Sequence, residues 1–574
     1  MNRHVARTFF TPAAIIALLL GTLLPTKRAA AETKTWIGGT DDWAIDSNWS
    51  PTDGYPDSTT VDVLIDGDDT ATNSAVLLDL NADVLSIEID AGDSLTHENG
   101  RSLTVNGNGA LNDGTWTLDG SPLSSAATEL VFSGPQTLGG SGEVVMSDDA
   151  QNTLWAGSNS DALTHSASHT IRGAGRLLSN RGDLINNGTI RATGANNPLT
   201  IDPTTTFTNH GTVRAEGAAG LRFGPGTFDL SGTTLEVLDG SRLAVGASAT
   251  VLNGVLDAGG TTGTGRVIAE NGSEFDGVTI AAGSTVNQEN GDTVDVLNGL
   301  TNNGTWSVNG AGASSSATDL VFKGSQTLEG SGELIMTDDP HNMFWMSSSG
   351  NTLTHGPNHT IRGAGRLLNN RGNMVNNGTI LATGQSNALT INPTTTFLNS
   401  PTGVLGGTGT LEFRDGTLVN NGTIAPGLST GELTIDGRVE NADTSILDIE
   451  VAGAGPGDFD RLLTNMEFEV DGLLRVTFLP GAGFLQTSDR LLVVDSAALI
   501  GGTAFDATQH VNTGYCDVDY DPVNGDIFLT NFRDTQTQPI PEPATVGLLA
   551  LGCAAIGAAI RRRRRGSKGF RSCK

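Results

Sequence analysis

The sequence predicts an all-β fold: a right-handed parallel β-solenoid with a β cap at each end, preceded by a signal peptide and followed by a transmembrane helix. Three observations predict the solenoid: a turn motif at a near-constant spacing, short segments of alternating polarity, and a long internal duplication. The chain has 574 residues, too many for one compact core. A rod in which each coil packs only on its neighbours solves that problem.

The recurring turn has the form Asn-x-Gly-Thr and leads into a β-branched or aromatic residue. Its glycines lie 23 residues apart between Gly188 and Gly211, and 44 residues, or twice 22, apart between Gly378 and Gly422. A period of about 22 residues is typical of one β-solenoid coil or one leucine-rich repeat. Because Gly and Asn interrupt these stretches too often for a helical half-repeat, we favour the solenoid.

Segments between the turns place a polar residue between two less polar ones, as in Leu199-Thr200-Ile201, so every second side chain can enter a narrow core. Gly supplies the positive φ that corners require, and Asn tolerates that conformation while hydrogen-bonding its own backbone. Stacked coils would bring corner asparagines to about 4.8 Å from one another, the spacing of an amide ladder.

The duplication has an offset of 190 residues and runs without a gap, so that Gly109–Phe207 matches Gly299–Phe397 at roughly 60% of positions. The segment His169–Leu178 recurs unchanged as His359–Leu368. The chain is therefore expected to divide as follows: signal peptide 1–31, Trp-rich cap and first coils 32–100, solenoid 101–440 containing the duplication (109–207 and 299–397), C-terminal β cap 441–535, and sorting segment 536–574.

Three tryptophans, Trp36, Trp43 and Trp49, mark the segment that precedes the solenoid. This stretch resembles the W-x-G-G…W…N-W-S segment at the start of many bacterial surface β-helix proteins. We interpret the rings as a plug for the open end of the rod, with a sugar-stacking platform as the alternative.

Charge separates the body of the chain from its two ends. The ends hold 12 of the 32 basic residues and none of the 63 acidic ones, so the body carries 20 basic against 63 acidic residues, a net charge of −43. A body this acidic repels nucleic acid and anionic lipid, and no nucleic-acid partner is expected.

The N-terminus has the layout of a secretory signal peptide. Arg3 and Arg7 precede an apolar run, and small residues then lead to a cleavage site between Ala31 and Glu32. Residues from Glu32 onward are therefore expected outside the cytoplasm.

The C-terminus combines three features in order. Pro541-Glu542-Pro543 is followed by an uncharged segment, 544–560, and then by a basic cluster of five arginines: Arg561, Arg562, Arg563, Arg564 and Arg565. The uncharged segment would cross the inner membrane with the arginines on the cytoplasmic side. This order closely resembles the PEP-CTERM sorting signal. That resemblance implies processing by an exosortase-type transpeptidase, transient inner-membrane anchoring, and display linked to exopolysaccharide.

Longer strands in 441–535 resemble the closing region of autotransporter-type passengers.

The densest basic cluster of the body is Arg172, Arg176 and Arg181, repeated as Arg362, Arg366 and Arg371. Parallel β-helix polysaccharide lyases use such arginines, so Arg172, Arg176, Arg362 and Arg366 are the candidate glycan contacts. Pairing with nearby aspartates is the alternative. Trp116 and Trp155, with their copies Trp306 and Trp345, are expected as core or corner fillers.

Paired aspartates and closely spaced histidines are two further patterns. Asp148-Asp149 and Asp338-Asp339 are interpreted as solvated turns, because neighbouring strand residues point to opposite faces. A four-residue separation on a strand puts His165 and His169 about 13 Å apart, too far for one metal ion. We expect no catalytic residues, metal site, dedicated calcium loop or cofactor.

Together these features predict a secreted protein of the cell surface or extracellular matrix with a structural or adhesive role. Its expected partners are the exosortase-type enzyme and extracellular polysaccharide or neighbouring surface proteins. The competing hypothesis is a polysaccharide lyase or glycoside hydrolase on the same fold.

Overall fold

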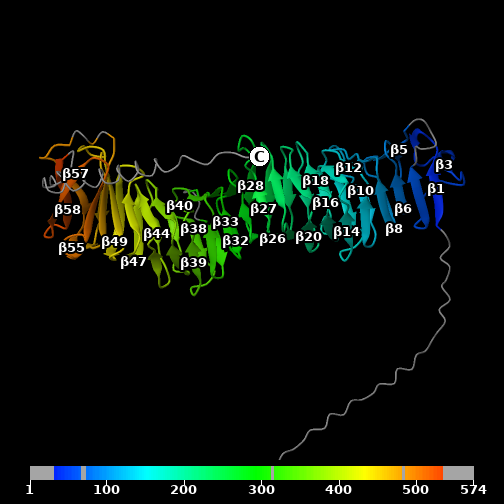
Figure 1. The fold of residues 1–574 in the computed structure, drawn as a ribbon. Coiled ribbons are helices and arrows are strands. Elements are labelled where there is room, and N and C mark those ends of the chain that lie inside the picture. The colour runs from blue at the N-terminus through cyan, green and yellow to red at the C-terminus, as the bar shows by residue number, and fades with distance from the viewer. Residues whose placement is uncertain (1–30, 66–72, 312–315, 481, 483–484, 534–574) are drawn as a thin grey trace, which may run out of the picture.

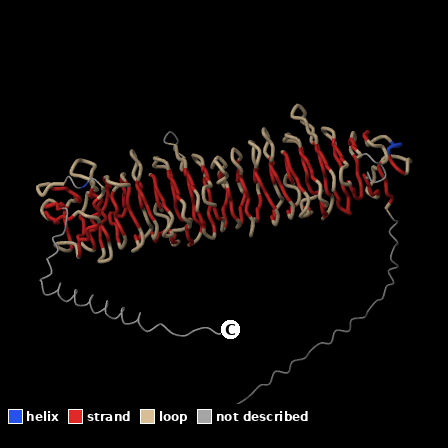
Figure 2. The backbone as a smooth tube through the Cα atoms, turned by 45° about the horizontal axis from the view of Figure 1, so that its top comes forward, coloured by secondary structure: helices blue, strands red, loops and turns tan. Residues whose placement is uncertain are grey.

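The computed structural model describes residues 31–533 except 66–72, 312–315, 481 and 483–484, and over this range the chain is a parallel β-solenoid of about 17 turns with almost no helix. Figure 1 shows the strands stacked side by side along one elongated rod, and Figure 2 shows loops projecting at its edges. The predicted solenoid is confirmed. The expected signal peptide and transmembrane helix lie outside the described residues.

Three sheets run along the rod. From β9 to β44 every strand pairs in parallel with the third strand after it, so each coil gives one strand to each of three sheets, named faces A, B and C. Face A comprises β10 (Thr128–Phe132), β13 (Asn152–Ala156), β16 (Gly175–Leu177), β19 (Leu199–Ile201), β22 (Leu221–Phe223), β25 (Arg242–Val245), β28 (Arg266–Ala269), β31 (Thr285–Gln288), β34 (Thr305–Val308), β37 (Glu333–Met336), β40 (Thr360–Gly363) and β43 (Thr379–Ala382).

Face B follows face A in each coil. It comprises β11 (Gln136–Gly139), β14 (Ala162–His165), β17 (Asp183–Asn186), β20 (Thr206–Asn209), β23 (Gly226–Asp229), β26 (Ala249–Leu252), β29 (Ser273–Asp276), β32 (Thr293–Leu297), β35 (Thr318–Lys323), β38 (Asn342–Met346), β41 (Gly365–Leu367) and β44 (Leu389–Ile391).

Face C completes the coil. It comprises β9 (Thr115–Leu118), β12 (Glu143–Met146), β15 (Thr170–Gly173), β18 (Thr189–Ala192), β21 (Thr212–Ala215), β24 (Thr234–Val237), β27 (Val255–Asp257), β30 (Thr279–Ile280), β33 (Leu300–Asn302), β36 (Gln326–Glu329), β39 (Thr352–His355), β42 (Asn373–Asn376) and β45 (Phe397–Asn399).

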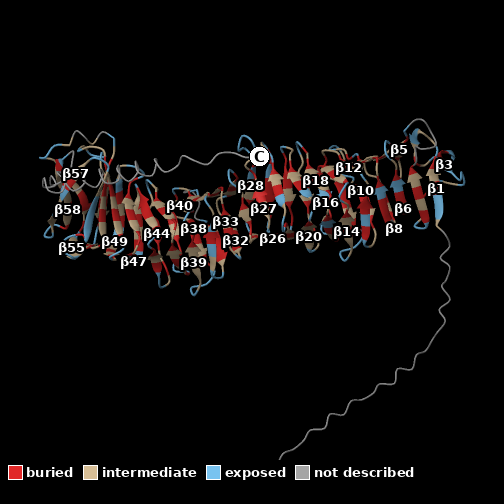
Figure 3. Cartoon of the chain, in the orientation of Figure 1, coloured by how far each residue is buried: buried red, intermediate tan, exposed pale blue. Residues whose placement is uncertain are grey.

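The core is a thin apolar column between the three faces. Along β19, Leu199 and Ile201 are buried while Thr200 between them is partly exposed, as the alternation of polarity predicts. Aromatic rings fill wider points of the column, where Phe223 and Phe228 stack at 3.9 Å between ring centroids. Figure 3 shows the same alternation of buried and partly exposed residues along the rod. Hydrophobic burial is therefore spread over the whole length of the rod.

The N-terminal end is closed by packed indoles. Its elements are β1 (Glu32–Trp36), β2 (Thr40–Asp42), the 3-10 turn η1 (Asp46–Asn48), β3 (Trp49–Ser50), β4 (Val61–Ile65), β5 (Ala75–Leu78), β6 (Ala82–Ile89), β7 (Ser94–His97) and β8 (Ser102–Asn112). Trp36 and Trp43 each meet Trp49 edge-on, at centroid distances of 5.0 and 4.7 Å. All three rings are buried, so none of them is a sugar-stacking platform.

The C-terminal end changes from parallel to antiparallel pairing. Its strands are β46 (Val404–Gly407), β47 (Thr410–Asn420), β48 (Thr423–Pro426), β49 (Glu432–Asn441), β50 (Ile446–Val451), β51 (Arg461–Thr464), β52 (Glu467–Val470), β53 (Leu473–Phe478), β54 (Arg490–Asp495), β55 (Ala498–Gly501), β56 (Ala507–Val511), β57 (Tyr515–Asp521) and β58 (Asp526–Arg533). The antiparallel hairpin β57–β58 pairs with β54. This hairpin covers a sheet edge that would otherwise be open to pairing.

Candidate functional site

The first candidate arginines are neutralised by acids of the preceding coil. Arg172 on β15 makes two hydrogen bonds to Glu143, at 2.7 and 2.9 Å, and Arg362 on β40 repeats the arrangement with Glu333, at 2.7 and 3.2 Å. The hydrogen bond from Arg172 lowers the pKa of Glu143. Two-pronged pairing of this kind fixes a guanidinium in place. Local pairing, the alternative given above, therefore describes Arg172 and Arg362, although their partners are glutamates rather than aspartates.

Arg172 also begins a row of arginines on face C. Its neighbours in register are Arg191 on β18 and Arg214 on β21. Arg191 makes two hydrogen bonds to Glu216, at 2.9 and 2.7 Å, and Arg214 donates to Glu236 at 2.6 Å. Each charge of the row has an acidic partner, so the row links coils to one another and leaves no free positive surface.

Arg176 and Arg366 lie elsewhere and have no such partner. Arg176 is on β16 of face A, whereas Arg172 is on face C, so the structure does not bring these two candidates together. The same separation holds for Arg362 on face A and Arg366 on face B. Within the described part of the chain, no carboxylate lies within 4.0 Å of the Arg176 or Arg366 guanidinium.

Two tryptophans that the sequence placed in the core or at corners lie on the outer surface. The guanidinium carbon of Arg181 lies 4.1 Å from the ring centroid of Trp155, and that of Arg371 lies 4.0 Å from the ring centroid of Trp345. Both indoles are only partly buried. The prediction was wrong for this pair, since their side chains occupy outward positions of β13 and β38. It was right for Trp116 and Trp306, which are fully buried.

The duplicated blocks occupy different faces. β13 belongs to face A, and its copy β38 belongs to face B. Likewise β12, which carries Glu143, is on face C, while its copy β37, which carries Glu333, is on face A. The second block is therefore displaced by one face around the rod.

The interior holds two polar seams. In the first seam, hydrogen bonds link Asn112 to His169 (3.0 Å), His169 to His165 (3.0 Å), His165 to Asn186 (2.6 Å) and Asn186 to Asn209 (2.7 Å). The predicted amide ladder is confirmed at Asn186–Asn209. The predicted separation of His165 and His169 was wrong, because the strand ends at His165 and the chain turns back.

The second seam repeats this order and extends it. Its members, in order, are Asn302, His359, His355, Asn376, Asn399, Asn420 and Asn441, joined by hydrogen bonds of 2.7 to 3.1 Å. The first seam follows the ends of face B strands, and the second follows the ends of face C strands. Burial lowers the pKa of His165 and His355 to about 4, and that of His169 and His359 to about 3.

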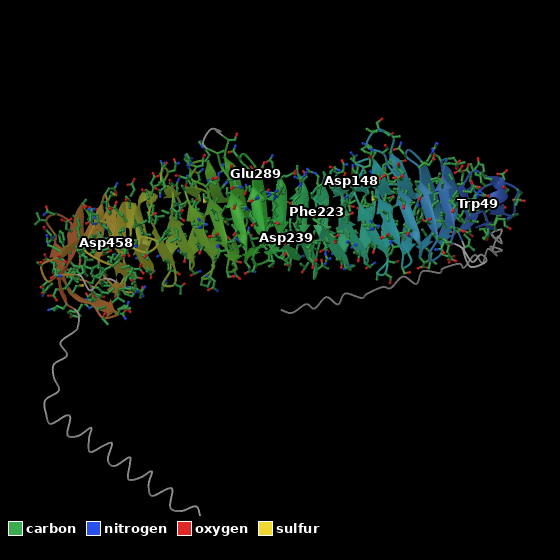
Figure 4. The ribbon with its side chains drawn as sticks, turned by 90° about the horizontal axis from the view of Figure 1, so that it is seen from above. Trp49, Asp148, Phe223, Asp239, Glu289 and Asp458 are labelled. Atoms are coloured by element: carbon green, nitrogen blue, oxygen red, sulfur yellow. The ribbon has the colours of Figure 1, made fainter. Side chains whose placement is uncertain are left out.

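The paired aspartates serve the fold. Asp148 accepts hydrogen bonds from the backbone N–H groups of Ala195, Asn196 and Asn197, at 2.9 to 3.1 Å, two coils away. Burial raises the pKa of Asp148, but these donors lower it on balance. Asp338 repeats the arrangement with residues 385–387. Figure 4 shows Asp148 at the edge of the rod, between Trp49 at one end and Asp458 at the other. Asp149 is buried, so the pair is not a solvated turn.

Neither a metal centre nor a membrane helix can be assigned in the described ranges. No group of three or more His, Cys, Asp or Glu side chains there could hold a metal ion. No helix in those ranges has the length and apolar character needed to cross a bilayer.

The molecule is thus a parallel β-solenoid whose tail carries a sorting signal. The model of the PEP-CTERM protein-sorting motif matches residues 539–565, which include Pro541–Pro543 and Arg561–Arg565. No curated protein matches the chain. The motif identifies an exported protein that an exosortase-type enzyme processes at the membrane for the cell surface. The motif and the expected cleavage site between Ala31 and Glu32 are features of the sequence, and the motif lies outside the described residues.

Proposed function

We propose that this exported rod has a structural or adhesive role at the cell surface or in the extracellular matrix, in association with exopolysaccharide. The observation that supports the proposal is the combination of a PEP-CTERM sorting motif with a long repetitive β-solenoid. A rod of stacked coils can offer the same weak contact more than once, and repeated contacts raise avidity without any tight single site. In this proposal, segment 544–560 anchors the chain transiently in the inner membrane.

Mass spectrometry of the surface form tests the processing step. We expect the chain to begin at Glu32 and to end near Pro541–Pro543, without the arginines 561–565. A surface form that keeps the arginine cluster would contradict processing. Replacing Glu542 with Ala should leave the unprocessed chain in the membrane fraction, and replacing the nearby Gln538 with Ala is the matched control.

A polysaccharide lyase or glycoside hydrolase is the competing function. The candidate arginines support a non-catalytic role, because Arg172 and Arg176 lie on different faces and Arg172 and Arg362 are each held by a glutamate. The purified protein should therefore release no product from a panel of acidic and neutral glycans. Reproducible product release that is lost in Arg172→Ala or Arg362→Ala would contradict this proposal and establish the enzyme.

A further inference from the structure

Two surface patches have the same composition. Patch A consists of Trp155, Arg176 and Arg181, and patch B consists of their copies Trp345, Arg366 and Arg371. In each patch one guanidinium lies about 4 Å above the outward indole. Stacking on a ring holds a guanidinium flat while its N–H edge stays free to donate hydrogen bonds. Each patch therefore presents a fixed donor edge beside a second arginine.

The arginines of the two patches make no salt bridge with a described residue, although Glu129, Asp202 and Asp319 lie close enough to Arg181, Arg176 and Arg371, respectively, to interact with their charges. Among the described residues, no acid forms an ion pair with Arg176, Arg181, Arg366 or Arg371, whereas Arg172, Arg191, Arg214, Arg222, Arg362 and Arg475 each pair with a Glu or Asp. Arg176, Arg181 and Arg371 are exposed. In a body with a net charge of −43, four exposed or partly exposed arginines that make no salt bridge with a described residue, at two equivalent places, favour an anionic ligand.

The patches point in different directions. The face A sheet runs unbroken from β13 through β37 and β40, and β38 is not part of it. β38 belongs to the face B sheet, which runs from β11 through β35. From β13 to β37 is eight coils, so at about 4.8 Å per coil the patches lie about 40 Å apart along the rod. A ligand on patch A and a ligand on patch B therefore lie on different sides.

We propose that patches A and B each bind a carboxylate-bearing polysaccharide, and that their placement on two faces lets one rod bridge two glycan chains. This inference rests on the proposed association with exopolysaccharide and names the chemistry of that partner. Guanidinium groups bind carboxylates through paired hydrogen bonds, and the repeated acidic groups of a polyuronate supply many such carboxylates. A rod with both patches on one face would instead hold a single chain along its length.

The test uses the purified full-length chain with sodium alginate as an acidic glycan and dextran as a neutral one. Network formation is followed by turbidity, and binding of a short alginate oligomer by calorimetry. We expect two oligomers per chain and turbidity with long alginate, both weakening as salt rises. Arg176→Gln with Arg181→Gln, and separately Arg366→Gln with Arg371→Gln, should each leave one oligomer site and abolish turbidity.

Arg101→Gln with Arg438→Gln is the matched control, because it removes the same charge from surface arginines outside both patches. This variant should keep two sites and full turbidity. Combining both patch variants should weaken oligomer binding at least about tenfold, with an unchanged circular dichroism spectrum. If alginate binds equally well to the patch variants, the inference fails while an association with polysaccharide stands. If each single-patch variant still forms networks, bridging is wrong. If neither alginate, dextran nor the cell's own matrix polysaccharide binds, the proposed function fails as well.

Discussion

The two copies of the duplicated block differ in their neighbours more than in themselves. Both copies keep the His–Asn hydrogen bonds, the aspartate that holds a loop two coils away, and the Glu–Arg pair. Yet Arg172 stacks beside Arg191, whereas Arg362 stacks beside Leu381, and the second seam runs on to Asn441.

A solenoid coil therefore depends on its adjacent coils and very little on its face. A block of sequence can therefore be copied onto other sheets without loss of its internal contacts, because each coil packs only on the coils above and below. What changes with the face is the direction in which the outward side chains point. Duplication thus gives the rod a second copy of one surface, turned to another side.

Acid should destabilise both copies equally, and this is the largest expected effect. The seam histidines are neutral in the native state, with pKa values of about 3 to 4, against about 6.5 in the unfolded chain. Their stabilisation is complete above pH 6.5. As pH falls toward 4 it declines by about 1.4 kcal/mol per pH unit for each histidine, because the unfolded chain binds protons that the native state excludes.

Thermal melting between pH 7.5 and 4.5 measures this loss. His169→Gln and His359→Gln should reduce the pH dependence by similar amounts, since burial lowers the pKa of both histidines to about 3. A melting temperature that does not fall below pH 6.5 would contradict the buried neutral seams.

Breaking either seam should cost roughly 2 to 6 kcal/mol of unfolding free energy. Asn186→Ala removes the partner of His165 Nδ1 and of Asn209 Oδ1, and Asn376→Ala removes the partner of His355 Nδ1 and of Asn399 Oδ1. Chemical denaturation should give equal costs for the two variants, although they lie at different corners of the rod. Ser158→Ala, on an exposed loop, should cost nothing measurable. Unequal losses of unfolding free energy in the two variants would contradict the equivalence of the two copies.

Removing one loop-holding aspartate should have a smaller and local effect. Asp148→Ala frees the N–H groups of residues 195–197, and Asp338→Ala frees those of 385–387, at roughly 1 kcal/mol each. Hydrogen exchange should quicken at the loop two coils away and stay unchanged in the other copy. Faster exchange only beside the substituted residue would contradict the long-range contact.

Removing the arginine of a Glu–Arg pair should have the smallest effect on the free energy of unfolding. It is also the one change whose effect should differ between the two copies. Arg362→Ala leaves Glu333 with no arginine beside it, whereas Arg172→Ala leaves Glu143 near Arg191, which also lowers the pKa of that acid. Both pairs are about one-third exposed, so solvent screening keeps each cost below about 1 kcal/mol. Denaturation should show a larger loss for Arg362→Ala. A larger loss for Arg172→Ala would contradict the role of the neighbouring arginine.

Local patterns in the sequence predicted most of the fold. The Asn-x-Gly-Thr turns, the alternation of polarity and the corner amide ladder are present as expected, because a coil is specified by its own residues and by the coils next to it. The burial of Trp116 and Trp306 followed from the same reasoning.

The faces could not be predicted, because coil length is not constant. Residues in register lie 27 apart from Glu143 to Thr170 but only 19 apart from Thr170 to Thr189. An offset of 190 residues therefore does not reveal how many strands it contains. For the same reason, the sequence could not separate Arg172 from Arg176 or place Trp155 on the surface. The contact between His165 and His169 could not be predicted either, because it depends on the strand ending at His165.

The central claim is that the two copies of the duplicated block present equivalent surfaces on different faces of the rod. Labelling equivalent corners of the two copies tests it most directly. Asn180 and Asn370 are exposed residues at matching positions of the two copies. Replacing both with cysteine, in a chain whose Cys553 and Cys573 are serine, allows each to carry a small gold cluster. Electron microscopy of single rods should then show two clusters about 40 Å apart along the axis and on different sides of the rod. Two clusters in line on one side would contradict the account.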